Sequence, residues 1–79
     1  MIKDKIKALL KISGKGNADA AAALDMPYHS FANKINQRGF KTEELIQLAE
    51  LTETELAFLD KKTGNKLIAF DLSDLPDKE

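Results

Sequence analysis

The side chains best suited to chemistry lie together between Met26 and Gly39. They are polar and mostly uncharged: Tyr28, His29, Asn33, Asn36, Gln37 and Arg38. An amide such as that of Asn33 donates and accepts hydrogen bonds at once, which suits the edge of an adenine base. No acidic residue occurs from Met26 to Arg38, so no carboxylate in this stretch would repel a phosphate. This set predicts hydrogen bonding to DNA rather than catalysis.

The residues needed for an enzyme are missing from the sequence. The chain has one histidine and no cysteine, so it has no disulfide framework, no thiolate metal site and no partner for a catalytic His29. The segment Gly14–Asn17 (GKGN) lacks the spacing and the Lys-Ser/Thr pair of a phosphate-binding loop. We therefore expect no enzymatic activity, no metal or cofactor, and no small-molecule substrate.

The charge of the chain is divided between its two halves. The formal net charge is −1, but residues 1–41 hold seven Lys, one Arg and three Asp, which gives +5. Residues 42–79 hold four Lys and ten acidic residues, which gives −6. Because the local field decides whether phosphate is attracted, the first half is suited to face DNA and the second half to face away.

Two helices are expected to position the polar set. Residues Asn17–Leu24 read as an alanine-rich helix, followed by a tight turn and a second helix that begins at Pro27 and ends at Gly39. Apolar residues recur where two steeply crossed helices would touch: Ala21, Leu24, Met26, Phe31 and Ile35. This is the pattern of a helix-turn-helix, in which the second helix enters the major groove. Flanking helices are expected over Ile2–Ile12 and over 42–51, the latter capped by Thr42.

The segment after Leu51 allows two interpretations. The run Thr52–Glu55 fits a capping box, which would begin a fifth short helix followed by one strand. The runs LAFLD and KLIAFDL around Gly64 fit a β-hairpin instead, and we favour the hairpin. We thus expect a mainly α fold of four helices followed by a hairpin or strand. The chain divides into residues 1–51, a C-terminal segment 52–72 and a flexible tail 73–79.

Residues 1 to about 51 resemble the DNA-binding domain of the phage repressor and Cro family, the lambda-repressor-like helix-turn-helix. The resemblance rests on the apolar positions listed above and on the run FANKINQRGFKTEELIQLAE. It departs from the family where Asp25 replaces the usual Gly of the turn, Asn17 replaces Gln, and Pro27 replaces Ser or Thr. Asp is among the few residues other than Gly that tolerate the left-handed conformation of such a turn.

The resemblance implies a set of DNA contacts. Base contacts would come from the second helix of the motif: Tyr28, His29 and Asn33. Phosphate contacts would come from its surroundings: Asn17, Lys15, Lys34, Asn36, Gln37, Arg38 and Lys41. The implied function is a sequence-specific transcriptional regulator of phage or prophage repressor type that binds double-stranded DNA. The alternative is a protein–protein interaction module built on the same scaffold.

A homodimer is expected because 79 residues bury only a modest core. The apolar side chains of the C-terminal segment need a partner surface, and we assign the interface to Phe58, Ile68, Phe70 and Leu72. No apolar run approaches the roughly 20 residues that span a bilayer. The first residues also lack the pattern of a signal peptide, so we expect a cytoplasmic protein without membrane contact.

Overall fold

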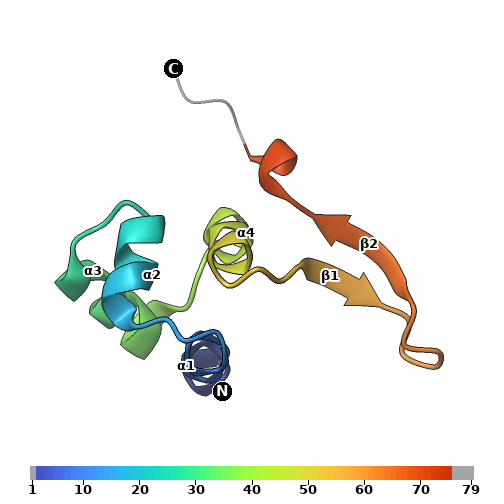
Figure 1. Ribbon diagram of the computed structural model, residues 1–79, viewed down its shortest axis with the longest axis horizontal. Helices are drawn as coiled ribbons and strands as arrows, with labels where there is room; N and C mark the ends of the chain where they lie inside the picture. The colour runs from blue at the N-terminus through green and yellow to red at the C-terminus, as the bar shows by residue number, and fades with distance from the viewer. Residues whose placement is uncertain (1, 76–79) are drawn as a thin grey trace.

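Four helices are followed by a two-stranded antiparallel sheet (Figure 1). The computed structural model describes residues 2–75, and only the backbone of Arg38. The helices are α1 (Ile2–Ile12), α2 (Asn17–Ala23), α3 (Tyr28–Asn33) and α4 (Thr42–Leu51), and a π-helical turn, η1 (Lys34–Arg38), continues α3. The strands are β1 (Leu56–Leu59) and β2 (Lys66–Phe70), and a 3₁₀ turn, η2 (Leu72–Asp74), follows them. The prediction of helices followed by a hairpin is confirmed at this level.

The core lies among the four helices. Its buried side chains come from every helix: Ile6, Leu10, Ala20, Ala21, Leu24, Phe31, Ile35 and Leu48. Phe31 is 0% exposed and lies against Phe40, with ring centroids 5.7 Å apart. Ala20 and Ala21 are almost fully buried, and such small side chains let α2 lie close to its neighbours. Every apolar residue predicted for the contact between the two central helices is buried or half-buried here.

A tight turn connects α2 to α3. Asp25 adopts φ 57°, the positive angle that the sequence predicted for this position. The N–H of Met26 donates to the carbonyl of Ala21 at 3.0 Å, and the N–H of Asp25 donates to Ala22 at 3.1 Å. Pro27 is the N-cap of α3, so the helix begins at Tyr28, one residue later than predicted.

The end of the α3–η1 segment differs from the prediction of a regular helix. Over η1 the chain widens into a π-helical turn, closed where the N–H of Gly39 donates to the carbonyl of Lys34 at 3.0 Å. Gly39 has φ 78° and ψ −163°. Its φ is positive, as predicted, but this combination is a fully extended conformation that is almost restricted to glycine, not the left-handed helical cap. Gly39 therefore turns the chain from α3 toward α4.

The prediction that Thr42 caps the fourth helix is wrong. Thr42 is the first helical residue, and Lys41 is the N-cap. The carboxylate of Glu44 accepts a hydrogen bond from the N–H of Lys41 at 2.8 Å, which satisfies one of the N–H groups that a helix start leaves unpaired. Glu44, in the first turn of α4, thus makes the capping interaction that was predicted for Thr42.

The alternative of a fifth helix after Leu51 is also wrong. The buried hydroxyl of Thr52 donates backward to the carbonyl of Leu48 at 2.9 Å, and the N–H of Thr54 donates to Ala49 at 2.9 Å. Glu53 has φ 57°, a conformation that interrupts a right-handed helix. The threonines therefore end α4 rather than begin a new helix.

The hairpin projects from the side of α4 (Figure 1). Opposite residues pair as Leu56 with Phe70 and Phe58 with Ile68, and a bulge follows Phe58. Gly64 has φ 78° in the connecting turn, as predicted. The second strand ends at Phe70 rather than at residue 72.

The expected flexible tail is only partly described. Residues 72–74 form η2, in which the Asp71 carboxylate accepts a hydrogen bond from the N–H of Ser73 at 2.9 Å. Residues 73 and 74 of the predicted tail belong to this turn, and the flexibility of the tail stays a prediction. Residues 76–79 of the predicted tail lie outside the described residues.

Candidate nucleic-acid interface

The outward side of α3 carries the three residues predicted to contact bases. Tyr28 is 56% exposed, and His29 and Asn33 are also exposed. On the inward side, Phe31 and the following Ile35 are buried in the core. A helix held from beneath by two large buried side chains presents its outer residues at a fixed angle, which base recognition requires.

A shallow hollow of about 320 Å³ lies on this outer surface. It is lined by Ser30, Asn33, Lys34 and Gln37. These residues are three or four positions apart, so they form a stripe along α3 and η1. Hydroxyl and amide groups dominate the stripe, and such groups donate and accept hydrogen bonds. These groups can hydrogen-bond a ligand that lies along the helix.

Lys34 belongs to an ion pair within the chain. Its Nζ lies 3.1 Å from Oε1 of Glu44, and the two side chains are only 25% and 15% exposed. Glu44 also accepts the N–H of Lys41, so one carboxylate holds both the ammonium and the start of α4. A phosphate would have to compete with this carboxylate for Lys34. This ion pair makes Lys34 less available to a phosphate than a free lysine would be.

The start of α2, where a phosphate contact was predicted, already holds a carboxylate of the chain. Asn17, predicted to contact phosphate, is the first residue of α2 and is half-buried. The carboxylate of Asp19 accepts the N–H of Gly16 at 2.9 Å. This acid occupies the helix start and would repel an approaching phosphate. Nearby Lys15 has a half-buried side chain.

The remaining predicted phosphate contacts lie around η1. Asn36 and Gln37 are exposed on the π-helical turn, and Lys41 is exposed just before α4. The side chain of Arg38 lies outside the described part of the chain, and only its backbone is placed in η1. The structure thus brings Asn33, Gln37 and Lys34 together, and it leaves Asn17 and Lys15 on another element.

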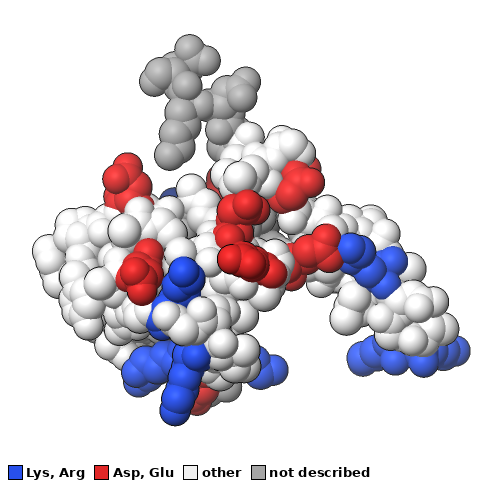
Figure 2. All heavy atoms as spheres, in the orientation of Figure 1, with Lys and Arg blue, Asp and Glu red and all other residues white. Residues whose placement is uncertain are grey.

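The two signs of charge occupy different parts of the surface. Figure 2 shows lysine side chains along one rim of the helical part and at the far end of the hairpin, whereas acidic side chains gather around α4 and η2. The basic rim of the helices follows from the basic first half of the sequence, whereas the lysines of the hairpin belong to the acidic second half. A polyanion would meet the rim on the side of α1 and η1 with the least repulsion.

The residues predicted to form a dimer interface separate into two groups. Phe58 and Ile68 are 65% and 59% exposed, and they form an opposite pair on the hairpin. Phe70 is half-buried and contacts Phe58 edge to face, with ring centroids 5.9 Å apart. These three residues share one face of the hairpin, because opposite residues of an antiparallel pair point to the same side.

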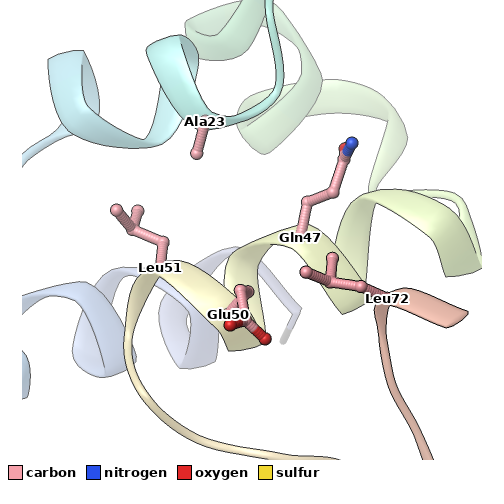
Figure 3. A pocket seen from close by; sticks show the side chains of 5 residues that line it. All are labelled: Ala23, Gln47, Glu50, Leu51 and Leu72. Carbon is pink, nitrogen blue, oxygen red and sulfur yellow. The ribbon is translucent and has the colours of Figure 1, made fainter.

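Leu72 does not belong to that face. It begins η2 and lines an open hollow of about 320 Å³ together with residues of α2 and α4 (Figure 3). The other lining residues are Ala23, Gln47, Glu50 and Leu51. Leu72 is 48% exposed, so it partly covers the helices of its own chain.

Two exposed leucines of the hairpin were missed by the sequence reasoning. Leu59 is 60% exposed, and Leu67, the unpaired residue of the bulge, is 64% exposed. Leu59 follows Phe58 directly on β1, so alternation places it on the opposite face, and both faces of the hairpin carry exposed apolar groups. The signal was present in the sequence, because four consecutive apolar residues in LAFL leave neither face of a strand polar.

Two carboxyl groups at the ends of the hairpin have pKa values below the ordinary 3.8. Backbone N–H donors from Thr63 and then Lys62 lower the pKa of Asp60. A hydrogen bond from the Ser73 hydroxyl, followed by one from the Ser73 N–H, lowers the pKa of Asp71. Both carboxylates are ionised at neutral pH and order the turns that contain them.

No described helix is long and apolar enough to cross a membrane. In the described part of the chain, no three or more His, Cys, Asp or Glu side chains gather in a way that could hold a metal ion. Comparison with family models, with curated proteins and with solved structures gave no match to this chain.

Proposed function

We propose that the protein is a sequence-specific DNA-binding transcriptional regulator of the phage repressor and Cro type. In this proposal α2 and α3 form a helix-turn-helix, and α3 lies in the major groove. The chain acts as a homodimer on two half-sites about one helical turn apart. Tyr28, His29 and Asn33 contact base edges, and Gln37 and Lys41 contact the backbone.

The observation that carries the proposal is the outer surface of α3. It exposes an aromatic hydroxyl, an imidazole and an amide on a helix fixed by Phe31 and Ile35. No acidic residue occurs along the sequence from Met26 to Arg38, although 13 acidic residues occur in the chain. An ordinary solvated helix has no reason to lack acids, whereas a helix that meets phosphates does.

Selection of bound sequences from random double-stranded DNA tests the proposal directly. We expect enrichment of a site with two related half-sites, because a two-fold dimer repeats its contacts. An enrichment indistinguishable from the input library would reject sequence-specific binding. That result would favour the alternative of a protein-interaction module, for which the exposed apolar groups of the hairpin would provide the surface.

The selected site then allows a test of single residues. Asn33→Ala should weaken binding by about 1–3 kcal/mol and relax the preference at one base pair. Asn65→Ala is the matched control, since it removes an exposed amide from the hairpin turn and should leave affinity unchanged. Equal losses on selected and random DNA would show that Asn33 does not read a base.

The phosphate contacts have a separate signature. Removal of Lys41 should weaken binding to all sequences alike and flatten the plot of log affinity against log salt by about one. Lys34→Met should change that slope less, because Glu44 already neutralises Lys34. A larger effect of Lys34 than of Lys41 would reverse this assignment.

A further inference from the structure

Helix α1 carries a large share of the positive charge of the chain. Four of its 11 residues are lysines and one is an aspartate, which gives +4 − 1 = +3. Lys5, Lys7 and Lys11 are exposed, and Lys3 is half-buried. Figure 2 shows lysine side chains along the rim of the helical part, on the side where Figure 1 places α1. The helix therefore presents a basic surface to solvent.

This charge has no counterpart within the described part of the chain. The two ion pairs found there join Lys34 to Glu44 and Lys66 to Glu55, and neither involves α1. Asp4, the acid of this helix, forms no ion pair with any described residue. The lysines of α1 are thus left to water or to an anion from outside the chain.

The arrangement of these lysines works against the stability of the helix itself. Lys3 and Lys5 lie in the first turn, where the helix dipole favours an acid and disfavours a base. Lys7 lies four residues after Lys3 and four before Lys11, and like charges at that spacing repel each other. Natural sequences break such local rules mainly at functional sites. The pattern therefore indicates a negatively charged ligand.

The start of α1 lies beside the segment that the proposed function places on DNA. A Cβ added to Gly39 would lie 3.9 Å from Cδ1 of Ile2, so the first residue of α1 adjoins the residue that follows η1. Helix α1 also packs against η1, on which Asn36 and Gln37 are exposed. A long ligand that meets the outer surface of η1 would therefore pass close to the first turns of α1.

We propose that Lys5 and Lys7 bind backbone phosphates of the same DNA whose major groove receives α3. The inference rests on the proposed DNA-binding function and extends its contact surface from α3 and η1 onto α1. A lysine ammonium binds phosphate as a point charge on a flexible stem, so it needs no fixed geometry. Each contact releases a counterion from the DNA and thus adds affinity and salt dependence without sequence preference.

The salt dependence of DNA binding tests the proposal on the full chain. Lys5→Gln with Lys7→Gln removes two exposed charges from α1. Lys61→Gln with Lys62→Gln is the matched control, because it removes two exposed charges from the turn of the hairpin. The α1 variant should lose about tenfold or more in affinity for double-stranded DNA, and its plot of log affinity against log salt should flatten by about two. The control should keep the native slope.

Urea unfolding separates a phosphate contact from a structural role. If the two lysines act on DNA, their removal relieves repulsion within α1, so the variant should unfold at the same or a higher urea concentration than the native chain. A structural role would instead lower both stability and affinity. Selection from random DNA should enrich the same site with the variant as with the native chain, because phosphate contacts carry no sequence information.

The outcomes for this proposal and for the proposed function can be distinguished. An unchanged salt slope in the α1 variant, an equal flattening in the hairpin control, or a lowered urea midpoint that accounts for the lost binding would each overturn the role of Lys5 and Lys7. In all three cases the native chain still binds DNA, so the proposed function stands. A native chain that binds no double-stranded DNA even at low salt would reject both, and an acidic protein surface would then be the partner that the charge of α1 fits.

Discussion

Glu44 offers the sharpest test of how the candidate interface is held together. Its carboxylate makes two contacts, one with the Lys41 N–H at 2.8 Å and one with the Lys34 ammonium at 3.1 Å. Loss of a cap interaction costs about 1 kcal/mol, with a range of roughly 0.5–2. A partly exposed ion pair contributes about 0.2–1 kcal/mol after screening by solvent. We therefore expect Glu44→Ala to lower the free energy of unfolding by about 1–2 kcal/mol.

Two further variants separate these contributions. Glu44→Gln keeps an amide oxygen that can accept the Lys41 N–H but removes the ion pair, and Lys34→Met removes only the ion pair. Each should cost about 1 kcal/mol or less, by the same ion-pair range. Urea unfolding at one fixed protein concentration measures all three, because a dimer would make stability depend on concentration. A loss for Lys34→Met as large as that for Glu44→Ala would refute the argument that the cap dominates.

The remaining predictions concern the backbone, the core and pH. Gly39→Ala should lower the free energy of unfolding by about 1–3 kcal/mol, because alanine is strained at this positive φ. A clash would not add to this cost, since the new Cβ would lie 3.9 Å from Ile2 Cδ1, which is an ordinary contact. Unchanged stability in urea unfolding would contradict this prediction. Phe31→Ala should cost about 3–5 kcal/mol, measured in the same way, because the ring is fully buried. The lowered pKa values of Asp60 and Asp71 mean that both carboxylates stabilise their turns above pH 3.8 and lose this effect as the pH falls below it. Amide NMR shifts of Thr63 and Ser73 should follow that change, and an Asp60→Asn chain should lose it at Thr63 only.

Elements that are determined by residues close together in the sequence could be predicted. The helical spacing of Ile2, Ile6, Leu9 and Leu10 predicted α1 with the bounds that the structure has. Of these residues Ile6 and Leu10 are buried, whereas Ile2 is exposed. Gly64 between two apolar runs indicated the hairpin, since its turn needs a positive φ. The positive φ of Asp25 followed from the turn that the two central helices require.

Features that depend on contacts between residues far apart in the sequence could not be predicted. The ion pair of Lys34 with Glu44 joins residues ten positions apart on different helices, so only the packed fold brings them together. The π-helical turn ends at Gly39 and accompanies the contact of Phe40 with Phe31, which no local pattern announces. The capping box at Thr52 misled for a related reason. The sequence pattern suggested that Thr52 caps a following helix, but its hydroxyl donates to a carbonyl of the preceding helix.

The α4 helix connects the candidate interface with the proposed dimer surface. At its start Glu44 holds Lys34 beside the outer surface of η1, and Leu45 lines the hollow next to the hairpin. At its end the buried Thr52 and the adjoining Thr54 bond back to the last turn, so the chain enters β1 without a flexible linker. We expect this junction to restrict the angle between the hairpin and α3. If two hairpins pair, the distance between the two copies of α3 is then set by the fold of each subunit, and DNA sites of one half-site spacing should be preferred over all others.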